Sequence, residues 1–232
     1  MSRIDELIKN IHEEKTERAV QRRQYNCQLS EIMRLVTAIG KDKFPHFVID
    51  NKNRFTYENT LLWLIGQNFK CLNPNDRSII DGNLQKGIYI AGSTGSGKSI
   101  LLEIICEVAL RIGILFGYGD DIKMLTGNCV RAQSICDEFK DSGEIKAYKE
   151  APILFIQDLG AEQTETMFMG NRNNVLREIL EHRGDNKRCI TLITSNNMIN
   201  DNDNIAKYGD RVISRLREMC NYFVLTGADR RN

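Results

Sequence analysis

The residues with the clearest chemical potential form a short run of glycine, serine, threonine and lysine near the middle of the chain. It fits the pattern GxxxxGK[ST] and consists of Gly92, Ser93, Thr94, Gly95, Ser96, Gly97, Lys98 and Ser99. Glycines let a backbone wrap closely round phosphates, and the loop amides and the following helix N-terminus attract the anion. Lys98 would reach the β- and γ-phosphates, and the Ser99 hydroxyl would ligate Mg²⁺. The run therefore predicts a binding loop for ATP and Mg²⁺.

The flanks of this loop support the same interpretation. A strand-like segment from Gly87 to Ala91 precedes it, and a strongly helical run follows it. A chance Gly/Ser turn before a helix is the alternative, but such a turn would not require the preceding strand.

A carboxylate is expected at the end of a second buried strand, Ile153 to Ile156. Nucleotide hydrolysis needs one there for the magnesium shell, and often another to orient the attacking water. Gln157 stands in the first acidic place and Asp158 in the second. Gln157 carries no charge, so we expect weaker magnesium binding and slow hydrolysis, unless Asp158 or Glu162 substitutes. Alternatively, Asp158 is a turn residue before Gly160.

A polar side chain is also expected at the tip of the buried strand from Cys189 to Thr194. This tip would lie between the phosphate-loop strand and the acidic strand. Asn196 would then reach the γ-phosphate or the attacking water. A simple Asx turn is the alternative for Asn196.

Composition limits the classes of function that the chain could have. Its 232 residues are 41% hydrophobic and 27% charged, which is typical of a globular protein. Lys and Arg number 32 against 31 Asp and Glu, giving a net charge of +1. No global field would draw the chain onto DNA or acidic lipid, so any nucleic-acid contact must be local.

Cysteine usage and hydropathy bear on metals and location. The seven cysteines form no CxxC pair and no His-Cys cluster, so structural zinc is not expected. With an odd count and no signal peptide, we expect free thiols in a reducing cytoplasm. The apolar stretch Ile100 to Leu110 is interrupted by Glu103 and Glu107 and falls short of the ~20 residues that cross a membrane.

The elements that must position these residues alternate along the second part of the chain. Short apolar runs alternate with amphipathic segments, a pattern typical of α/β proteins with a parallel sheet between helices. Strands are expected near 87–91, 122–126, 153–157, 190–194 and 222–225, and helices near 98–112, 129–141, 173–183 and 208–218. We therefore expect residues 72–232 to form a P-loop NTPase core with a five-stranded parallel sheet.

Residues 1–71 are expected to form a helical extension and linker. Apolar residues recur at helical spacing in two sets: Ile4, Leu7, Ile8 and Ile11, then Leu29, Ile32, Met33, Val36 and Ile39. Gly40 is expected to end the helix that holds the second set. Residues 41–58 are expected to form a linker, and Asn59 is expected to cap a further helix. The extension either packs on its own core or docks a partner.

Four motifs together resemble one family. They are GSTGSGKS at 92–99, PILFIQDLGAE at 152–162, ITLITSNN at 190–197 and YGDRVISRLREM at 208–219. Over roughly residues 86–231 the chain resembles AAA+ ATPases of the DnaC/DnaI helicase-loader group and their IstB-like transposition-helper relatives. Gln157 departs from the family pattern, which has an acid there.

The resemblance implies roles that the residues alone do not. Asn196 would be the sensor 1 residue, and Arg215 the arginine finger that enters a neighbouring subunit's site in an ATP-bound homo-oligomer, with Arg211 as a competing candidate. The N-terminal segment would grip a replicative DNA helicase, and the core would contact single-stranded DNA. The basic candidates for that contact are Lys140, Lys146, Lys149, Arg172 and Arg177. Two alternatives stay open: a transposition helper, and a nucleotide-gated binding module without hydrolysis.

Overall fold

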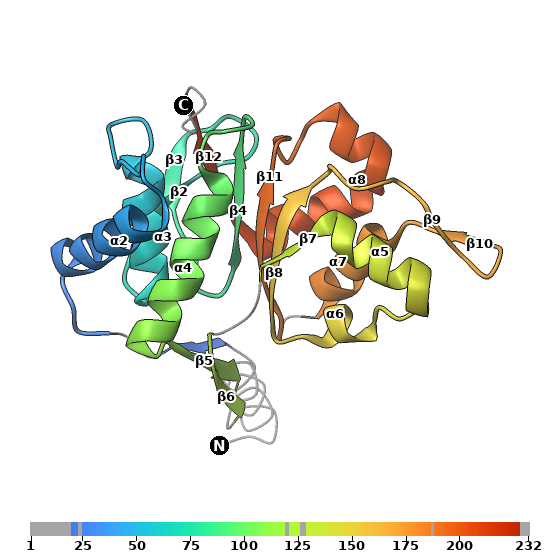
Figure 1. Ribbon diagram of the computed structural model, residues 1–232, viewed down its shortest axis with the longest axis horizontal. Coiled ribbons are helices and arrows are strands. Elements are labelled where there is room, and N and C mark those ends of the chain that lie inside the picture. Colours follow the sequence, from blue (N-terminus) through green and yellow to red (C-terminus); the bar gives the residue numbers. More distant parts are fainter. Residues whose placement is uncertain (1–19, 23–24, 119–120, 126–128, 187, 228–232) are drawn as a thin grey trace, which may run out of the picture.

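A central sheet lies between two layers of helices (Figure 1). The computed structural model describes residues 20–22, 25–118, 121–125, 129–186 and 188–227. One layer holds α2 (Leu29–Lys43), α3 (Arg54–Leu64) and α4 (Lys98–Ile112). The other holds α5 (Ala132–Ser142), α6 (Lys146–Glu150), α7 (Val175–Asp185) and α8 (Asn202–Met219). None of these helices is both long enough and apolar enough to cross a membrane.

The main sheet has the strand order β3-β2-β12-β4-β11-β8-β7. Its strands are β2 (Lys70–Leu72), β3 (Ile79–Asp81), β4 (Gly87–Gly92), β7 (Cys129–Arg131), β8 (Ile153–Leu159), β11 (Ile190–Ser195) and β12 (Cys220–Leu225). The five strands from β12 to β7 run parallel, which confirms the predicted parallel sheet. Every residue of β4 and β11 is buried, as expected for central strands covered on both faces.

A strand near 122–126 was predicted for the parallel sheet, but the strand found there belongs to another sheet. β6 (Asp121–Met124) pairs antiparallel with β5 (Leu115–Tyr118), and β1 (Val20–Arg22) pairs with β5, forming a separate three-stranded sheet. The fifth parallel strand is instead β7, and α5 begins only after it, at Ala132. A short apolar run has the same pattern in a hairpin and in a parallel strand, so the pattern did not distinguish them.

Gly40 does not end its helix, contrary to the expectation. Helix α2 continues to Lys43, and Gly40 is buried within it. A Cβ atom added at Gly40 would lie 2.3 Å from the ring of Phe47. Glycine is therefore present because the helix and the Phe47 ring approach closely.

Asn59 was expected to cap a helix, and this prediction is wrong. Helix α3 begins earlier, at Arg54, with Asn53 at the N-cap position. Inside α3, the Asn59 amide donates to the carbonyl of Phe55 at 2.8 Å and accepts from the backbone N–H of Lys70 at 2.7 Å. Asn59 thus fastens α3 to β2.

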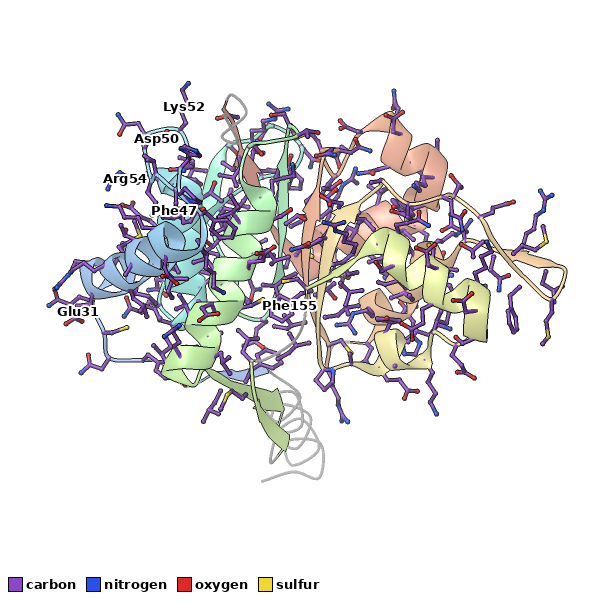
Figure 2. All side chains as sticks on the ribbon, in the orientation of Figure 1. Glu31, Phe47, Asp50, Lys52, Arg54 and Phe155 are labelled. Atoms are coloured by element: carbon purple, nitrogen blue, oxygen red, sulfur yellow. The ribbon has the colours of Figure 1, made fainter. Side chains whose placement is uncertain are left out.

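The described part of the N-terminal segment belongs to the apolar core on the α4 side of the sheet. Ile32, Val36 and Trp63 are buried in one cluster with residues of β4 and α4. The same cluster includes Phe47 and Phe155, the latter from β8, and both are labelled in Figure 2. The division at 71/72 stays a prediction, and this point falls inside β2. The first apolar set, from Ile4 to Ile11, lies outside the described residues.

A two-stranded hairpin, β9 (Thr166–Phe168) and β10 (Asn171–Asn173), extends from the α5 side of the molecule (Figure 1). Met169 at its turn is 86% exposed. Phe168 of β9 packs against Phe139 of α5, with ring centroids 5.8 Å apart, so the hairpin is attached to α5.

Candidate phosphate-binding site

The GxxxxGK[ST] run forms a curled loop between β4 and α4. The backbone N–H of Ser96 donates to the carbonyl of Ser93 at 3.2 Å. Gly95 and Gly97 have φ angles of 79° and 94°, in the left-handed region that glycine adopts without strain. The strand–loop–helix context predicted from the sequence is confirmed, and the loop leads directly into the N-terminus of a 15-residue helix. That terminus carries unpaired backbone amides and a positive dipole.

The Lys98 ammonium lies at the head of the loop. Its Nζ atom donates to the carbonyls of Gly92 at 2.7 Å and Ser93 at 2.8 Å, and to Oδ1 of Asn196 at 2.9 Å. Lys98 is only 5% exposed. Strand β11 lies between β4 and β8, as expected, and its end brings Asn196 to Lys98. The structure thus brings together a cation and a polar side chain from elements 98 residues apart in the sequence.

Ser96 supplies a buried polar atom that lacks a partner. Its Oγ atom is buried without a hydrogen bond to any described residue, and the residue is 1% exposed. Leaving such a group unpaired costs about 1–3 kcal/mol. A phosphate oxygen accepts hydrogen bonds and would satisfy this hydroxyl, so the loop fits a phosphate group.

Magnesium is expected at Ser99, in the first turn of α4, where the side chain is half-buried. Among the described residues, no three His, Cys, Asp or Glu side chains are grouped to hold a metal ion. A magnesium ion held by Ser99 and Asp158 would therefore depend largely on phosphate oxygens, as such ions do beside bound nucleotides.

The end of β8 is irregular at the two residues where acids were expected. Ile156 pairs with Ile193, but Leu159 pairs with Ser195, so β8 has one extra residue in this stretch. Asp158 occupies the bulge, with a φ angle of 56°. Aspartate tolerates this left-handed conformation better than most residues.

The backbone of Asp158 forms hydrogen bonds typical of a turn at the end of a strand, which is the alternative interpretation of this residue. Its N–H donates to Oγ1 of Thr194 at 3.1 Å, and its carbonyl accepts from the N–H of Ala161 at 3.0 Å. The side chain is half-buried. Its role as a magnesium carboxylate stays a prediction.

Glu162 is held by residues of α8. Its carboxylate accepts hydrogen bonds from the N–H of Gly160 at 2.9 Å and from the Tyr208 hydroxyl, and pairs with Lys207 at 3.1 Å. Burial, followed by the charge of Glu162, raises the pKa of Tyr208, which keeps the phenol protonated as a donor. These contacts fix the position of the Glu162 carboxylate against α8, and its catalytic role stays a prediction. Sequence reasoning missed both α8 partners, because only the fold brings them together.

The two candidate arginine fingers share one carboxylate. Arg211 pairs with Asp185 at 3.2 Å, and Arg215 pairs with Asp185 and, at 3.5 Å, with Glu218. Asp185 is the last residue of α7, so both arginines tie α8 to α7 within this chain. The finger role stays a prediction.

This chain resembles known proteins in its fold. No family model and no curated protein matches the sequence. Among solved structures, a candidate primosome component from Streptococcus pyogenes serotype M3 is 23% identical, with a TM-score of 0.51 over 79% of this chain and 84% of that one. The DnaC helicase loader is 19% identical, with a TM-score of 0.50 over 77% of this chain and 93% of that one. The chain has the AAA+ fold.

A third structure is longer than this AAA+ chain. The replication initiator DnaA, bound to AMPPCP and single-stranded DNA, is 18% identical, with a TM-score of 0.52. The match covers 79% of this chain but 49% of DnaA. Identities this low establish the fold alone.

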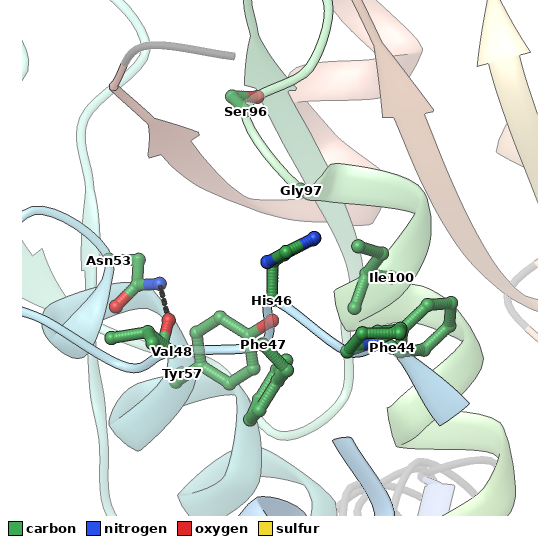
Figure 3. A pocket seen from close by; sticks show the side chains of 10 residues that line it. Phe44, His46, Phe47, Val48, Asn53, Tyr57, Ser96, Gly97 and Ile100 are labelled. Atoms are coloured by element: carbon green, nitrogen blue, oxygen red, sulfur yellow. Dashed lines mark hydrogen bonds between the residues drawn. The ribbon is translucent and has the colours of Figure 1, made fainter. Parts of the chain in front are cut away.

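An apolar cavity of about 260 Å³ adjoins the phosphate loop of this AAA+ core (Figure 3). Its lining consists of Phe44, Pro45, His46, Phe47, Val48, Asn53 and Tyr57 together with Ser96, Gly97 and Ile100. Sequence reasoning treated residues 41–58 as a linker and missed it. The spaced apolar residues Phe44 and Phe47 were the available signal.

Three of the five basic residues considered for DNA have acidic partners. Lys149 pairs with Glu178 at 2.5 Å, Arg177 with Glu181 at 3.2 Å, and Arg172 with Glu165 at 3.8 Å. Lys140 and Lys146 are exposed on and after α5. Exposed pairs of this kind are worth little to stability.

Proposed function

We propose that this chain is an ATPase that acts in DNA replication as a helicase loader on single-stranded DNA. The contact of Lys98 with the loop carbonyls and with Asn196 carries the proposal. In the proposed complex Lys98 would lie beside the γ-phosphate of ATP, and Asn196 would be able to detect that phosphate.

ATP fits the features around the loop. Loop amides, the α4 N-terminus and the Ser96 hydroxyl would bind the phosphates, and the 260 Å³ cavity would hold the base. Lys98 would exchange its loop carbonyls for phosphate oxygens. Magnesium, bound at Ser99 and Asp158, would neutralise charge that develops on the phosphates. With Gln157 in the first acidic place, we expect slow turnover.

The proposed partners follow from the similar structures. DnaC is described as a helicase loader, and DnaA was solved with single-stranded DNA. For this chain we propose that residues 1–71 contact a replicative helicase, that exposed lysines such as Lys140 contact the DNA backbone, and that ATP promotes a homo-oligomer.

Replacing Lys98 tests nucleotide binding. Lys98→Ala removes the charged donor for the β- and γ-phosphates, so affinity for a fluorescent ATP analogue should fall roughly 10- to 100-fold. Lys140→Ala, an exposed lysine on α5, is the matched control and should bind as the wild type does. Unchanged affinity in Lys98→Ala would contradict ATP binding by this loop.

Capture of the host's replicative helicase tests the loader function. ATP-dependent retention of the helicase, with phosphate release stimulated by single-stranded DNA, is the expected result. ATP-dependent filaments on double-stranded DNA without helicase retention would instead support a transposition helper. ATP binding without phosphate release would support a nucleotide-gated module, most clearly if Gln157→Asp restored release.

A further inference from the structure

Gln157 brings no negative charge to the end of β8, where a magnesium shell needs one. The structure places the carboxylate of Glu103 next to Gln157. Gln157 is 6% exposed at the end of β8. Its Nε2 atom donates to Oε1 of Glu103, on α4, at 3.3 Å. The two residues are 54 positions apart, so the fold alone joins them.

Glu103 lies on the same side of α4 as the expected magnesium ligand. It follows Ser99 by four residues, and residues at this spacing are stacked on one helix face. Side chains of a helix lean toward its N-terminus. The Glu103 side chain is therefore inclined back toward the turn that carries Ser99 and toward the phosphate loop.

The contact with Glu103 also fixes which way the Gln157 amide faces. A carboxylate only accepts hydrogen bonds, so Gln157 must present its NH₂ group to Glu103. Its carbonyl oxygen is then the end that can accept from a magnesium-bound water.

The charge of Glu103 has no cationic partner among the described residues. Glu107, one turn further along α4, differs: it pairs with Lys43 and Arg111, each at 2.7 Å. A half-buried carboxylate without a local cation strengthens the hydrogen bond from Gln157 and favours a nearby positive ion.

We infer that Glu103 is a positioning residue that supplies, through Gln157, the negative charge missing from the end of β8. It polarises and orients the Gln157 amide, whose oxygen would be available to accept from the water shell of a bound magnesium ion. The inference rests on the proposed function, because it concerns the same nucleotide site. The negative charge near the magnesium ion would then come from Glu103 on α4 and not from an acidic residue at the end of β8.

Magnesium-dependent nucleotide binding tests the inference without measuring turnover. A fluorescent ATP analogue is titrated in EDTA and at increasing Mg²⁺ concentrations. Glu103→Gln should weaken the affinity in Mg²⁺ roughly 3- to 10-fold and leave the affinity in EDTA unchanged. The matched control Glu107→Gln should behave as the wild type does. Glu103→Gln/Gln157→Asp, which moves the carboxylate onto β8, should recover the wild-type Mg²⁺ dependence.

Each contrary outcome has a distinct meaning. If Glu103→Gln matches the wild type, or loses affinity equally in EDTA, or is not rescued by Gln157→Asp, the positioning role is overturned while ATP binding stands. If the wild type binds no nucleotide, the proposed function is overturned and this role with it. Should Glu103→Gln fail to fold, Glu103→Asp keeps the charge with a shorter reach. It should lose affinity only in Mg²⁺, and an unchanged Mg²⁺ dependence would overturn the role.

Discussion

Cys106 of α4 and Cys129 of β7 form a close pair. Their sulfurs lie 3.4 Å apart, joining α4 to the edge strand β7, and both are free thiols. A hydrogen bond from Cys106 holds the pKa of Cys129 below its usual value, because it stabilises the Cys129 thiolate. The same bond, with burial, raises the pKa of Cys106. The two thiols should therefore differ in reactivity.

We predict that Cys129 is alkylated before the other described cysteines at pH 7. Thiolate is the reactive form, and a thiol with a lowered pKa keeps more thiolate as the pH falls below about 8.5. Cys106→Ala removes the donor, raises the Cys129 pKa and should slow its alkylation at pH 7 about fivefold. Iodoacetamide labelling followed by mass spectrometry over a pH series measures both effects.

Cys189 serves as the internal reference in that labelling series. Burial raises its pKa, so it should react slowly in both proteins and only as the pH rises. Labelling of Cys106 ahead of Cys129, or an unchanged Cys129 profile in Cys106→Ala, would contradict the assigned hydrogen-bond direction.

The residues that the sequence revealed are those whose roles depend on local backbone geometry. The glycines and Lys98 of the loop could be recognised because the loop conformation needs those types at those positions. Asn196 was predicted from its place at a strand end, and the structure brings it to Lys98. Glu103 was not found, because its contact with Gln157 depends on how α4 lies against β8.

Among the elements, α2 is the one whose packing can be tested most directly. Gly40→Ala should gain up to about 1 kcal/mol from helix propensity. It should lose about 1–3 kcal/mol because its Cβ would lie 2.3 Å from the Phe47 ring. The loss is expected to exceed the gain, so the variant should unfold at lower urea concentration.

A compensating change distinguishes crowding from other effects of the Gly40 substitution. Phe47→Leu gives up apolar contacts but removes the ring that the new methyl group meets. Gly40→Ala should therefore destabilise the Phe47→Leu background less than the wild type, in the same urea measurement. Equal effects in both backgrounds would show that the Phe47 ring is not the cause.

Elements with continuous burial were predicted well, and short edge elements were not. β4 and β11 are buried along their whole length, and their sequences are uncharged throughout. This pattern predicts a strand whichever neighbours the strand pairs with. The segment at 122–126 and the three residues of β7 carry too little pattern to show which partner they choose. Pairing partners are set by the whole sheet, and α5 therefore began later than expected.

For the whole molecule, the proposed homo-oligomer requires an arginine of one subunit to enter the site of its neighbour. Arg211 and Arg215 are engaged by Asp185 within the chain, and Gly184 approaches Arg215 so closely that an added Cβ would lie 2.6 Å from the Arg215 Cβ. A finger entering a neighbour's site must first leave Asp185. The phosphates of the neighbour offer greater negative charge than one carboxylate, so ATP would favour that exchange.

Arg215→Ala should separate binding from assembly. Dilute protein should bind the ATP analogue with wild-type affinity, because Arg215 does not contact its own phosphate loop. At concentrations where subunits associate, phosphate release per subunit should fall about tenfold or more, since a finger neutralises charge on the γ-phosphoryl group. Arg217→Ala is the matched control, because Arg217 lies on the same helix and donates to Asn200 at 2.7 Å. Equal losses in both variants, or a loss independent of protein concentration, would contradict a role in trans, and a loss confined to Arg211→Ala would move the finger one turn along α8.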